Sequence, residues 1–127
     1  MNRFNVFEKD VVENILKSYD DSFGFKILEQ YKCCTVTKRV LTGVGFFTSF
    51  QVGDLSMSLG KDINLRLGGI GAKIKGLKDE HAGFVLYIEN GILTELEGYS
   101  YGGDRWPKKI TDYTLYLINK DGSLTDL

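Results

Sequence analysis

The sequence has one proline, one histidine and two cysteines in 127 residues. The histidine, His81, has no second imidazole or thiolate at ligand spacing, which disfavours a zinc site, and no serine or cysteine partner for nucleophilic catalysis. Cys33 and Cys34 are adjacent, and strand neighbours point to opposite faces, so a disulfide between them would be strained. We therefore expect free thiols in the cytoplasm, no metal, no other cofactor and no enzymatic activity.

Neither sign of charge is in excess, because 16 Lys and Arg balance 17 Asp and Glu. No basic stripe of the kind that releases counterions from nucleic acid is present. The apolar runs are far shorter than the ~20 residues of a membrane span. The first ten residues, MNRFNVFEKD, contain no apolar signal core. We expect neither nucleic acid nor a membrane as a partner.

A chain of this length has the size of one domain. No repeat, linker or low-complexity segment divides it. The sequence therefore predicts a single domain over residues 1–127. Its expected parts are a helical segment over residues 6–32, a sheet over residues 33–118 and a polar tail over residues 119–127.

Residues 6–20 predict an amphipathic helix, because apolar side chains recur on one face at helical spacing. Glu8 falls on the polar face, and Asn5 precedes it at the spacing of a capping box. A second short element over residues 23–31 has helical spacing, although part of it would equally suit a strand. The apolar face of the first helix consists of Phe7, Val11, Val12, Ile15, Leu16 and Tyr19.

From Cys33 onward the hydrophobic period changes to two, which is typical of half-buried strands in an antiparallel sheet. One or two N-terminal helices packed on an antiparallel β-sheet meander is the predicted architecture, and the fold class is α+β. The alternating segments are residues 34–40, 44–52, 63–67, 70–74, 83–97 and 113–118.

Residues 83–97 predict a hairpin that turns at Asn90–Gly91. A two-residue loop there would place Leu86 opposite Glu95 and mix the two faces. A three-residue loop with Gly91 left-handed in a bulge gives one apolar face, and we favour it. It sends Tyr87, Glu95 and Glu97 to the other face. The expected apolar-face pairs are Ile88 with Ile92, Leu86 with Thr94 and Phe84 with Leu96.

Fifteen glycines stand out, and most lie between residues 43 and 103, where they indicate turns, bulges and close backbone approach. The glycine-rich residues 67–73 do not fit a phosphate-binding loop, because Leu77 follows Gly76 where Lys and Ser or Thr are needed. They do not fit a dinucleotide fingerprint either, because a strand pattern follows instead of a helix. A bulge or bend is the better interpretation.

A pair of glutamates, a pair of lysines and the histidine are interpreted as structural residues and not as catalytic ones. Glu95 and Glu97 share one strand face and could serve acid–base chemistry in a cleft. Lys73 and Lys75 have the same spacing, so we favour cross-strand ion pairing on a solvated face. His81 is expected in a solvated turn between two strands.

The segment from residue 97 to residue 107 is rich in aromatic side chains, among three glycines. Tyr, Trp and Arg are the residues that dominate protein interfaces. The alternative is that Trp106 closes the open end of the core. The candidate partner-binding residues are Tyr87, Glu95, Glu97, Tyr99, Tyr101, Asp104, Arg105 and Trp106.

Two blocks of the chain carry a resemblance to a known family. The first is LTGVGFFT at residues 41–48, and the second is GFVLYIENGILTELEGYSYGGDRWP at residues 83–107. Together they resemble a family of small, mostly uncharacterised bacterial proteins, to which no reaction is attached. In size and style, though not in motif, the chain is also similar to the immunity proteins that protect bacteria against secreted toxins.

These features favour a non-catalytic protein-binding domain, most concretely an immunity protein that neutralises a cognate toxin by covering its active site. If that toxin has a basic cleft, Glu95 and Glu97 could mimic phosphates. The alternative is a small-ligand binder or modest enzyme with a pocket between helices and sheet. A homodimer that uses the aromatic patch as its own interface is a third possibility. The residues expected to line the alternative pocket are Phe46, Phe47, Tyr99 and Trp106.

Overall fold

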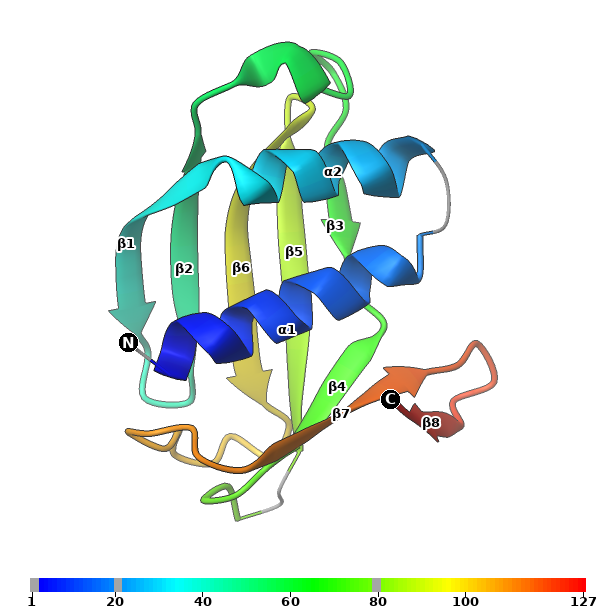
Figure 1. The fold of residues 1–127 in the computed structure, drawn as a ribbon. Coiled ribbons are helices and arrows are strands. Elements are labelled where there is room, and N and C mark those ends of the chain that lie inside the picture. Colours follow the sequence, from blue (N-terminus) through cyan, green and yellow to red (C-terminus); the bar gives the residue numbers. More distant parts are fainter. Residues whose placement is uncertain (1–2, 20–21, 79–80) are drawn as a thin grey trace.

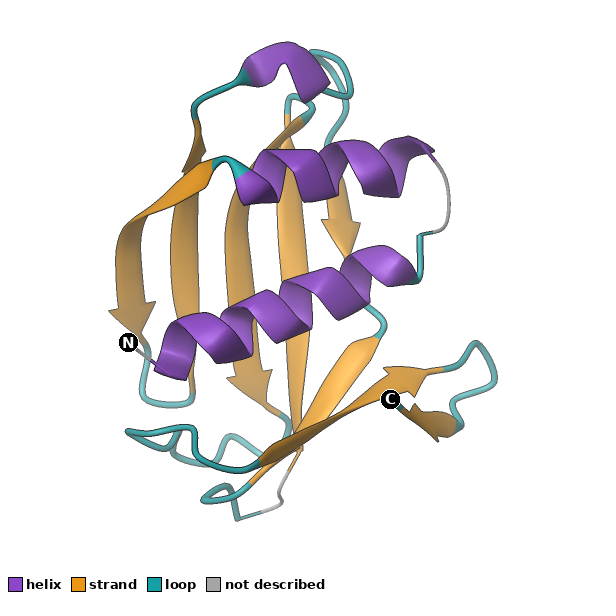
Figure 2. Ribbon diagram, viewed as in Figure 1, coloured by secondary structure: helices purple, strands orange, loops and turns teal. Residues whose placement is uncertain are grey.

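The computed structural model describes residues 3–19, 22–78 and 81–127. Within them, two α-helices cover one face of an eight-stranded antiparallel sheet (Figures 1 and 2), which confirms the predicted α+β class. The helices are α1 (Arg3–Lys17) and α2 (Ser22–Lys32), and a 3₁₀ turn spans Leu55–Met57. The strands are β1 (Cys34–Leu41), β2 (Gly45–Val52), β3 (Leu65–Leu67), β4 (Ile70–Ile74), β5 (His81–Glu89), β6 (Ile92–Ser100), β7 (Tyr113–Ile118) and β8 (Leu124–Asp126).

Both predicted N-terminal elements are helices. Helix α1 begins at Arg3, before the predicted start at residue 6, and it ends at Lys17, before the predicted end at residue 20, which itself lies outside the described residues. Residue 5 therefore lies within the helix and not at the predicted N-cap position. No helix in the described ranges is long and apolar enough to cross a membrane.

Glu8 departs from its predicted place on a polar helix face, because it is 2% exposed. Its carboxylate accepts hydrogen bonds from the Arg39 guanidinium, at 2.5 Å from Nη2, and from the Thr48 hydroxyl. A buried carboxylate is tolerated when it is paired and hydrogen-bonded in this way. Periodicity along α1 could not reveal this partner, since Arg39 lies on β1.

The sheet follows the order β1-β2-β6-β5-β4-β7-β8, and β3 pairs with β5 beyond the end of β4. The order is not consecutive throughout, because β6 lies between β2 and β5. A register shift between Val36 and Lys38 interrupts the pairing of β1 with β2. Gly69, with φ of 93°, turns the chain between β3 and β4, where a bend was predicted.

The β5–β6 hairpin differs from the predicted register. Asn90 and Gly91 have φ of 52° and 79°, as a two-residue type I′ turn requires, and Glu89 pairs with Ile92. The extra residue is at Thr94, inside β6, where the register shifts, so the favoured three-residue loop is wrong. Beyond this bulge, the apolar face is restored by the pairing of Leu86 with Leu96.

The core lies between the helices and the sheet. Phe7 of α1 is fully buried, and its ring packs edge-on against three others: the centroid distances are 6.5 Å to Phe46, 5.6 Å to Phe84 and 4.9 Å to Tyr113. These rings come from β2, β5 and β7, which are far apart in the sequence. Aromatic packing of one α1 side chain therefore joins strands across the sheet.

The predicted polar tail is partly a strand. Residues 124–126 form β8, which pairs with β7 through Tyr116 with Asp126 and Ile118 with Leu124. Gly122, with φ of 89°, permits the turn. The side chains of β8 are exposed, so hydrophobic alternation gave no signal there.

One buried polar side chain ties α2 to the β5–β6 turn. Gln30 is fully buried, and its Nε2 donates to the carbonyl oxygens of Met57 at 2.8 Å and Gly91 at 3.0 Å. Its Oε1 accepts from the backbone N–H of Leu93 at 2.8 Å. Since buried polar groups must be hydrogen-bonded, this side chain supplies partners for the Met57 carbonyl and the Leu93 N–H, and it adds a second donor to the Gly91 carbonyl, which also accepts from the Leu59 N–H.

We predict that Gln30→Leu lowers the free energy of unfolding by about 3 kcal/mol, because buried backbone groups then lose their partners. Urea denaturation followed by circular dichroism measures this loss. The control is Gln51→Leu, an exposed position of β2, which should change stability by less than about 0.5 kcal/mol. Equal effects of both variants would contradict the assigned role of Gln30.

Candidate functional site

The candidate site is the face of the sheet turned away from α1 and α2, which we call the outer face. Figure 1 shows both helices on the same side of the sheet. Among the residues that the structure describes, no helix covers the opposite side. Side chains on the outer face are therefore not covered by a helix, although one of them, Tyr116, is buried by its neighbours.

At the turn end of β5 and β6, the outer face carries an aromatic–acidic group. Tyr87 lies opposite Glu95, and the Tyr87 hydroxyl donates to Oε1 of Glu97 at 2.6 Å. The Arg66 guanidinium of β3 lies 5.6 Å from the centre of the Tyr87 ring. The common face predicted for Tyr87, Glu95 and Glu97 is therefore confirmed, although the bulge that produces it is at Thr94 and not in the turn.

A hollow of about 800 Å³ opens beside this group. Carboxylates and amides in its lining can accept hydrogen bonds from a cationic group, and the Tyr87 ring offers a π face. Its lining consists of Asn64, Leu65, Arg66, Tyr87, Ile88, Glu89, Asn90 and Glu95.

Two pKa shifts describe the electrostatics of this group. Burial, opposed by a hydrogen bond from Ser49 and reinforced by Glu89 and Glu97, raises the pKa of the Glu95 carboxyl. The hydrogen bond to Glu97, then burial, raise the pKa of Tyr87 to about 12. The charges of neighbouring carboxylates are a smaller cause of both shifts, and a cation brought there would offset that part.

A second cluster lies at the other end of the outer face, and it contains the only histidine. The His81 Nδ1 lies 2.9 Å from the Tyr116 hydroxyl, and the His81 ring is parallel to the Tyr101 ring at 6.4 Å between centroids. Tyr99 lies against Tyr101 at 5.8 Å. Burial, then the neighbouring Tyr101, raise the pKa of Tyr116 to about 12.

Two glycines make room for these rings. A Cβ on Gly83 would lie 2.7 Å from both Tyr101 Cε1 and Tyr99 Oη, and one on Gly71 would lie 2.6 Å from the Tyr116 ring. Sequence analysis missed His81, Tyr116 and these glycines as parts of the site. The available signal was a glycine at an outer-face position inside a strand, which indicates close approach by another group.

The structure corrects two of the predicted roles. His81 is the half-buried first residue of β5 and is not in a solvated turn. Ion pairing of Glu95 and Glu97 with Lys73 and Lys75 is wrong, because β5 separates β6 from β4. Lys75 lies instead 3.9 Å from the Asp112 carboxylate on an exposed surface.

The predicted partner-binding residues do not form one surface. Tyr87, Glu95, Glu97, Tyr99 and Tyr101 share the outer face, as described above. Asp104, Arg105 and Trp106 lie in the loop after β6, where the Ser100 hydroxyl donates to the Asp104 carbonyl at 2.8 Å.

Trp106 is 7% exposed, and its ring packs 5.4 Å from the Phe46 ring on the helix side. It closes one end of the core, which was the alternative interpretation of this residue. Tyr101, by contrast, is about half exposed on the outer face. Trp106 therefore contributes to stability, and Tyr101 is the aromatic side chain that a partner could contact.

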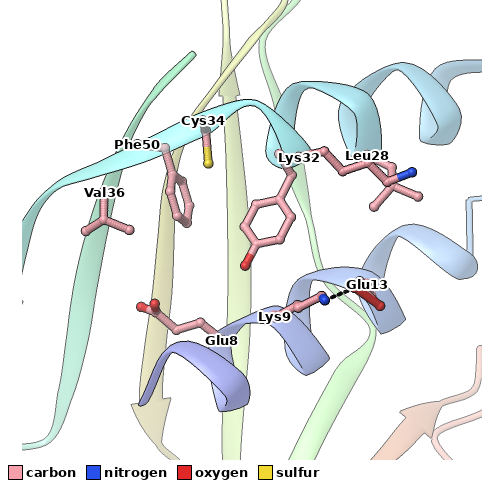
Figure 3. Close-up of a pocket in the computed structure, with 9 residues that line it drawn as sticks. Glu8, Lys9, Glu13, Leu28, Lys32, Cys34, Val36 and Phe50 are labelled. Carbon is pink, nitrogen blue, oxygen red and sulfur yellow. Dashed lines mark ion pairs between the residues drawn. The ribbon is translucent and has the colours of Figure 1, made fainter. Parts of the chain in front are cut away.

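The predicted ligand pocket with aromatic walls is not formed by the expected residues. Phe46 and Trp106 are packed in the core, whereas Phe47 and Tyr99 belong to strand positions on the outer face. A different groove lies between α1, α2 and β1 (Figure 3). Among the described residues, no group of three or more His, Cys, Asp or Glu side chains could hold a metal ion.

The chain matches no family model, and no curated protein or solved structure is significantly similar to it. The resemblance of residues 41–48 and 83–107 to small bacterial proteins stays a prediction.

We predict that Glu97→Gln lowers the pKa of Tyr87 from about 12 toward its ordinary value of 10.0, because the carboxylate that holds its proton is removed. The fold favours the protonated phenol, so this group's contribution to stability is complete below pH 10.0 and is lost as the pH rises toward about 12. NMR titration of ring-labelled tyrosine measures the pKa. Glu95→Gln is the control, because Glu95 is the weakest cause of the shift; a larger change in this control would contradict the assignment.

Proposed function

We propose that this chain is a non-catalytic protein-binding domain, and that its outer face binds a partner protein with a basic surface. The observation that supports this proposal is the presentation of tyrosines and carboxylates on one uncovered sheet face. Tyr87, Glu95 and Glu97 are held there by strand pairing and by a phenol–carboxylate hydrogen bond of 2.6 Å. Side chains fixed before binding lose less entropy when a partner is bound.

The negative charge around the hollow favours a partner that supplies lysine or arginine side chains. Glu89 and Glu95 line the hollow, and Arg66 is the cation among its lining residues. Glu97 lies close enough to Glu95 to contribute to its raised pKa. A lysine or arginine from a partner would find carboxylates and the Tyr87 ring in the same place. Such complementarity increases the association rate and disfavours acidic partners.

The second cluster of the outer face provides aromatic contact area for a partner. Tyr99 and Tyr101 are 37% and 49% exposed, and tyrosine contributes large contact area at low entropic cost. The rings rest on Gly83, where no side chain competes for the space. This aromatic–acidic face, together with the packing of Phe46 and Trp106 in the core, favours protein binding over the alternative of a small-ligand pocket with those aromatic walls between helices and sheet.

A toxin-neutralising immunity protein is the most concrete form of this function. Such a protein needs a shaped acidic surface and no catalytic residues. An acidic face that covers a basic active site would compete with the anionic substrate of a nuclease toxin. The resemblance in size and style to immunity proteins points the same way.

The test is an affinity capture from the native host with tagged wild-type and variant proteins, followed by measurement of Kd for the purified partner. Tyr101→Ala should weaken binding by about 2 kcal/mol, or about 30-fold. Phe25→Ala is the matched control, because Phe25 is a similarly exposed aromatic side chain on α2. Equal affinity of both variants, with the fold intact, would place the interface elsewhere.

Three further measurements distinguish an immunity protein, a homodimer and a binder of a basic partner. Inhibition of the partner's own activity by the domain would support the immunity role, and tight binding without inhibition would exclude it. A concentration-dependent dimer in size-exclusion chromatography that Tyr101→Ala dissociates would instead identify a second copy as the partner. Glu95→Gln should reduce the salt dependence of the association rate if the partner is basic.

A further inference from the structure

A groove of about 380 Å³ lies on the helix side of the sheet, between α1, α2 and β1 (Figure 3). Its volume falls within the range of small-molecule sites. It is separated from the outer face by the sheet itself, so its role is independent of the function proposed above.

The groove has an apolar wall. Leu28 of α2, Val36 of β1 and Phe50 of β2 line it, and the Phe50 ring meets the Tyr31 ring edge-on at 5.7 Å with an interplanar angle of 88°. Two perpendicular rings form a corner that can receive an apolar body or face a cation with π electrons.

Its polar lining is unusual because a buried carboxylate reaches it. In Figure 3, Glu8 extends from α1 toward the space below Val36 and Phe50. Oε2 of Glu8 accepts from both Arg39 and Thr48, whereas Oε1 accepts only from Arg39 among the described residues. Because each carboxylate oxygen has two lone pairs, Oε1 can accept one more hydrogen bond.

Tyr31 supplies a second acceptor. Within the described part of the chain, its hydroxyl has no hydrogen-bond partner, although its ring lines the groove. Burial raises the pKa of this hydroxyl most, followed by the charge of Glu8, with smaller contributions from Cys34 and Glu13, and Arg39 opposes the shift. Burial disfavours any charge in this interior. Among the charge contributions, those of Glu8, Cys34 and Glu13 act against negative charge, and that of Arg39 acts in its favour.

The two lysines that line the groove add little positive charge to its interior. Lys9 lies 3.8 Å from Glu13 and Lys32 lies 3.7 Å from Glu29, and the lysine side chains are 68% and 61% exposed. Charges in that position are screened by water and salt. The Cys34 thiol stays neutral at ordinary pH, because burial raises its pKa to about 11.

We propose that this groove binds a small primary ammonium ion carried on an apolar body. The ammonium group donates to Glu8 Oε1 and to the Tyr31 hydroxyl. The apolar body packs against Leu28, Val36 and Phe50. The site is a binding site only, and no bond of the ligand is made or broken in it.

The test uses three probes of matched shape: benzylammonium, benzyl alcohol and phenylacetate. Binding is followed at pH 7 by the chemical shifts of the Leu28 and Val36 methyl groups. Benzylammonium should bind with a Kd of about 1 mM, as expected for a ligand with so few atoms. The other two probes should bind at least about tenfold more weakly, since neither supplies a charged donor.

Tyr31→Phe is the decisive variant, because it removes a hydroxyl that has no described protein partner and should leave the thermal midpoint unchanged. It should weaken benzylammonium binding roughly tenfold. Tyr87→Phe, on the outer face, is the matched control and should have no effect.

The proposal is overturned if phenylacetate or benzyl alcohol binds as tightly as benzylammonium, or if Tyr31→Phe binds it as wild type does. It is also overturned if benzylammonium gives no methyl shifts at concentrations up to about ten times the expected Kd. None of these outcomes bears on the partner of the outer face, because Tyr101→Ala tests that surface separately.

Discussion

The outer face depends on a single unpaired residue, Thr94. Side chains alternate along a strand, so an added residue reverses the face of every position beyond it. Without this bulge, the two-residue turn would direct Leu96 toward solvent and Glu95 and Glu97 toward the helices. The Thr94 hydroxyl donates to the Tyr87 carbonyl at 3.2 Å, which stabilises the irregular pairing. One residue thereby separates the apolar side of the hairpin from the acidic side.

Hydrogen bonds on the helix side of the sheet also hold the β5–β6 hairpin in place. Gln30 reaches from α2 to the turn, and the Gly91 N–H donates to the Ile63 carbonyl at 2.8 Å. The turn is thus covered by chain from the 3₁₀ region, although it is formed by the Asn–Gly pair that usually marks an exposed hairpin end. The hollow on the outer face lies beside this turn, and these hydrogen bonds hold the turn from the opposite side of the sheet. A partner bound there would meet a preformed surface.

Local periodicity was sufficient to predict the first helix, most strands and the division of the hairpin into an apolar and an acidic face, whereas the spacing over residues 23–31 suited either a helix or a strand. These features depend on neighbours in the sequence, where the period of 3.6 or 2 is visible. The position of the bulge, the burial of Glu8 and the packing of Trp106 under Phe46 depend on contacts between distant segments. Of the candidate binding residues, those on β5 and β6 share one face because of strand alternation. The loop after β6 has no such rule: Trp106 is turned inward, whereas Tyr101 is about half exposed.

The register shift in β1 affects how copies of this chain can associate through the edges of their sheets. Among the described strands, β1 ends the sheet on one side and carries exposed Val36 and Val40. A regular, apolar edge of this length would be a template for stacking with other chains. The register shift before Lys38 twists the edge at its middle, and the lysine brings a charge that a second, identical edge would oppose. The chain can therefore present an open sheet face to a partner while its nearest free edge resists growth into fibres.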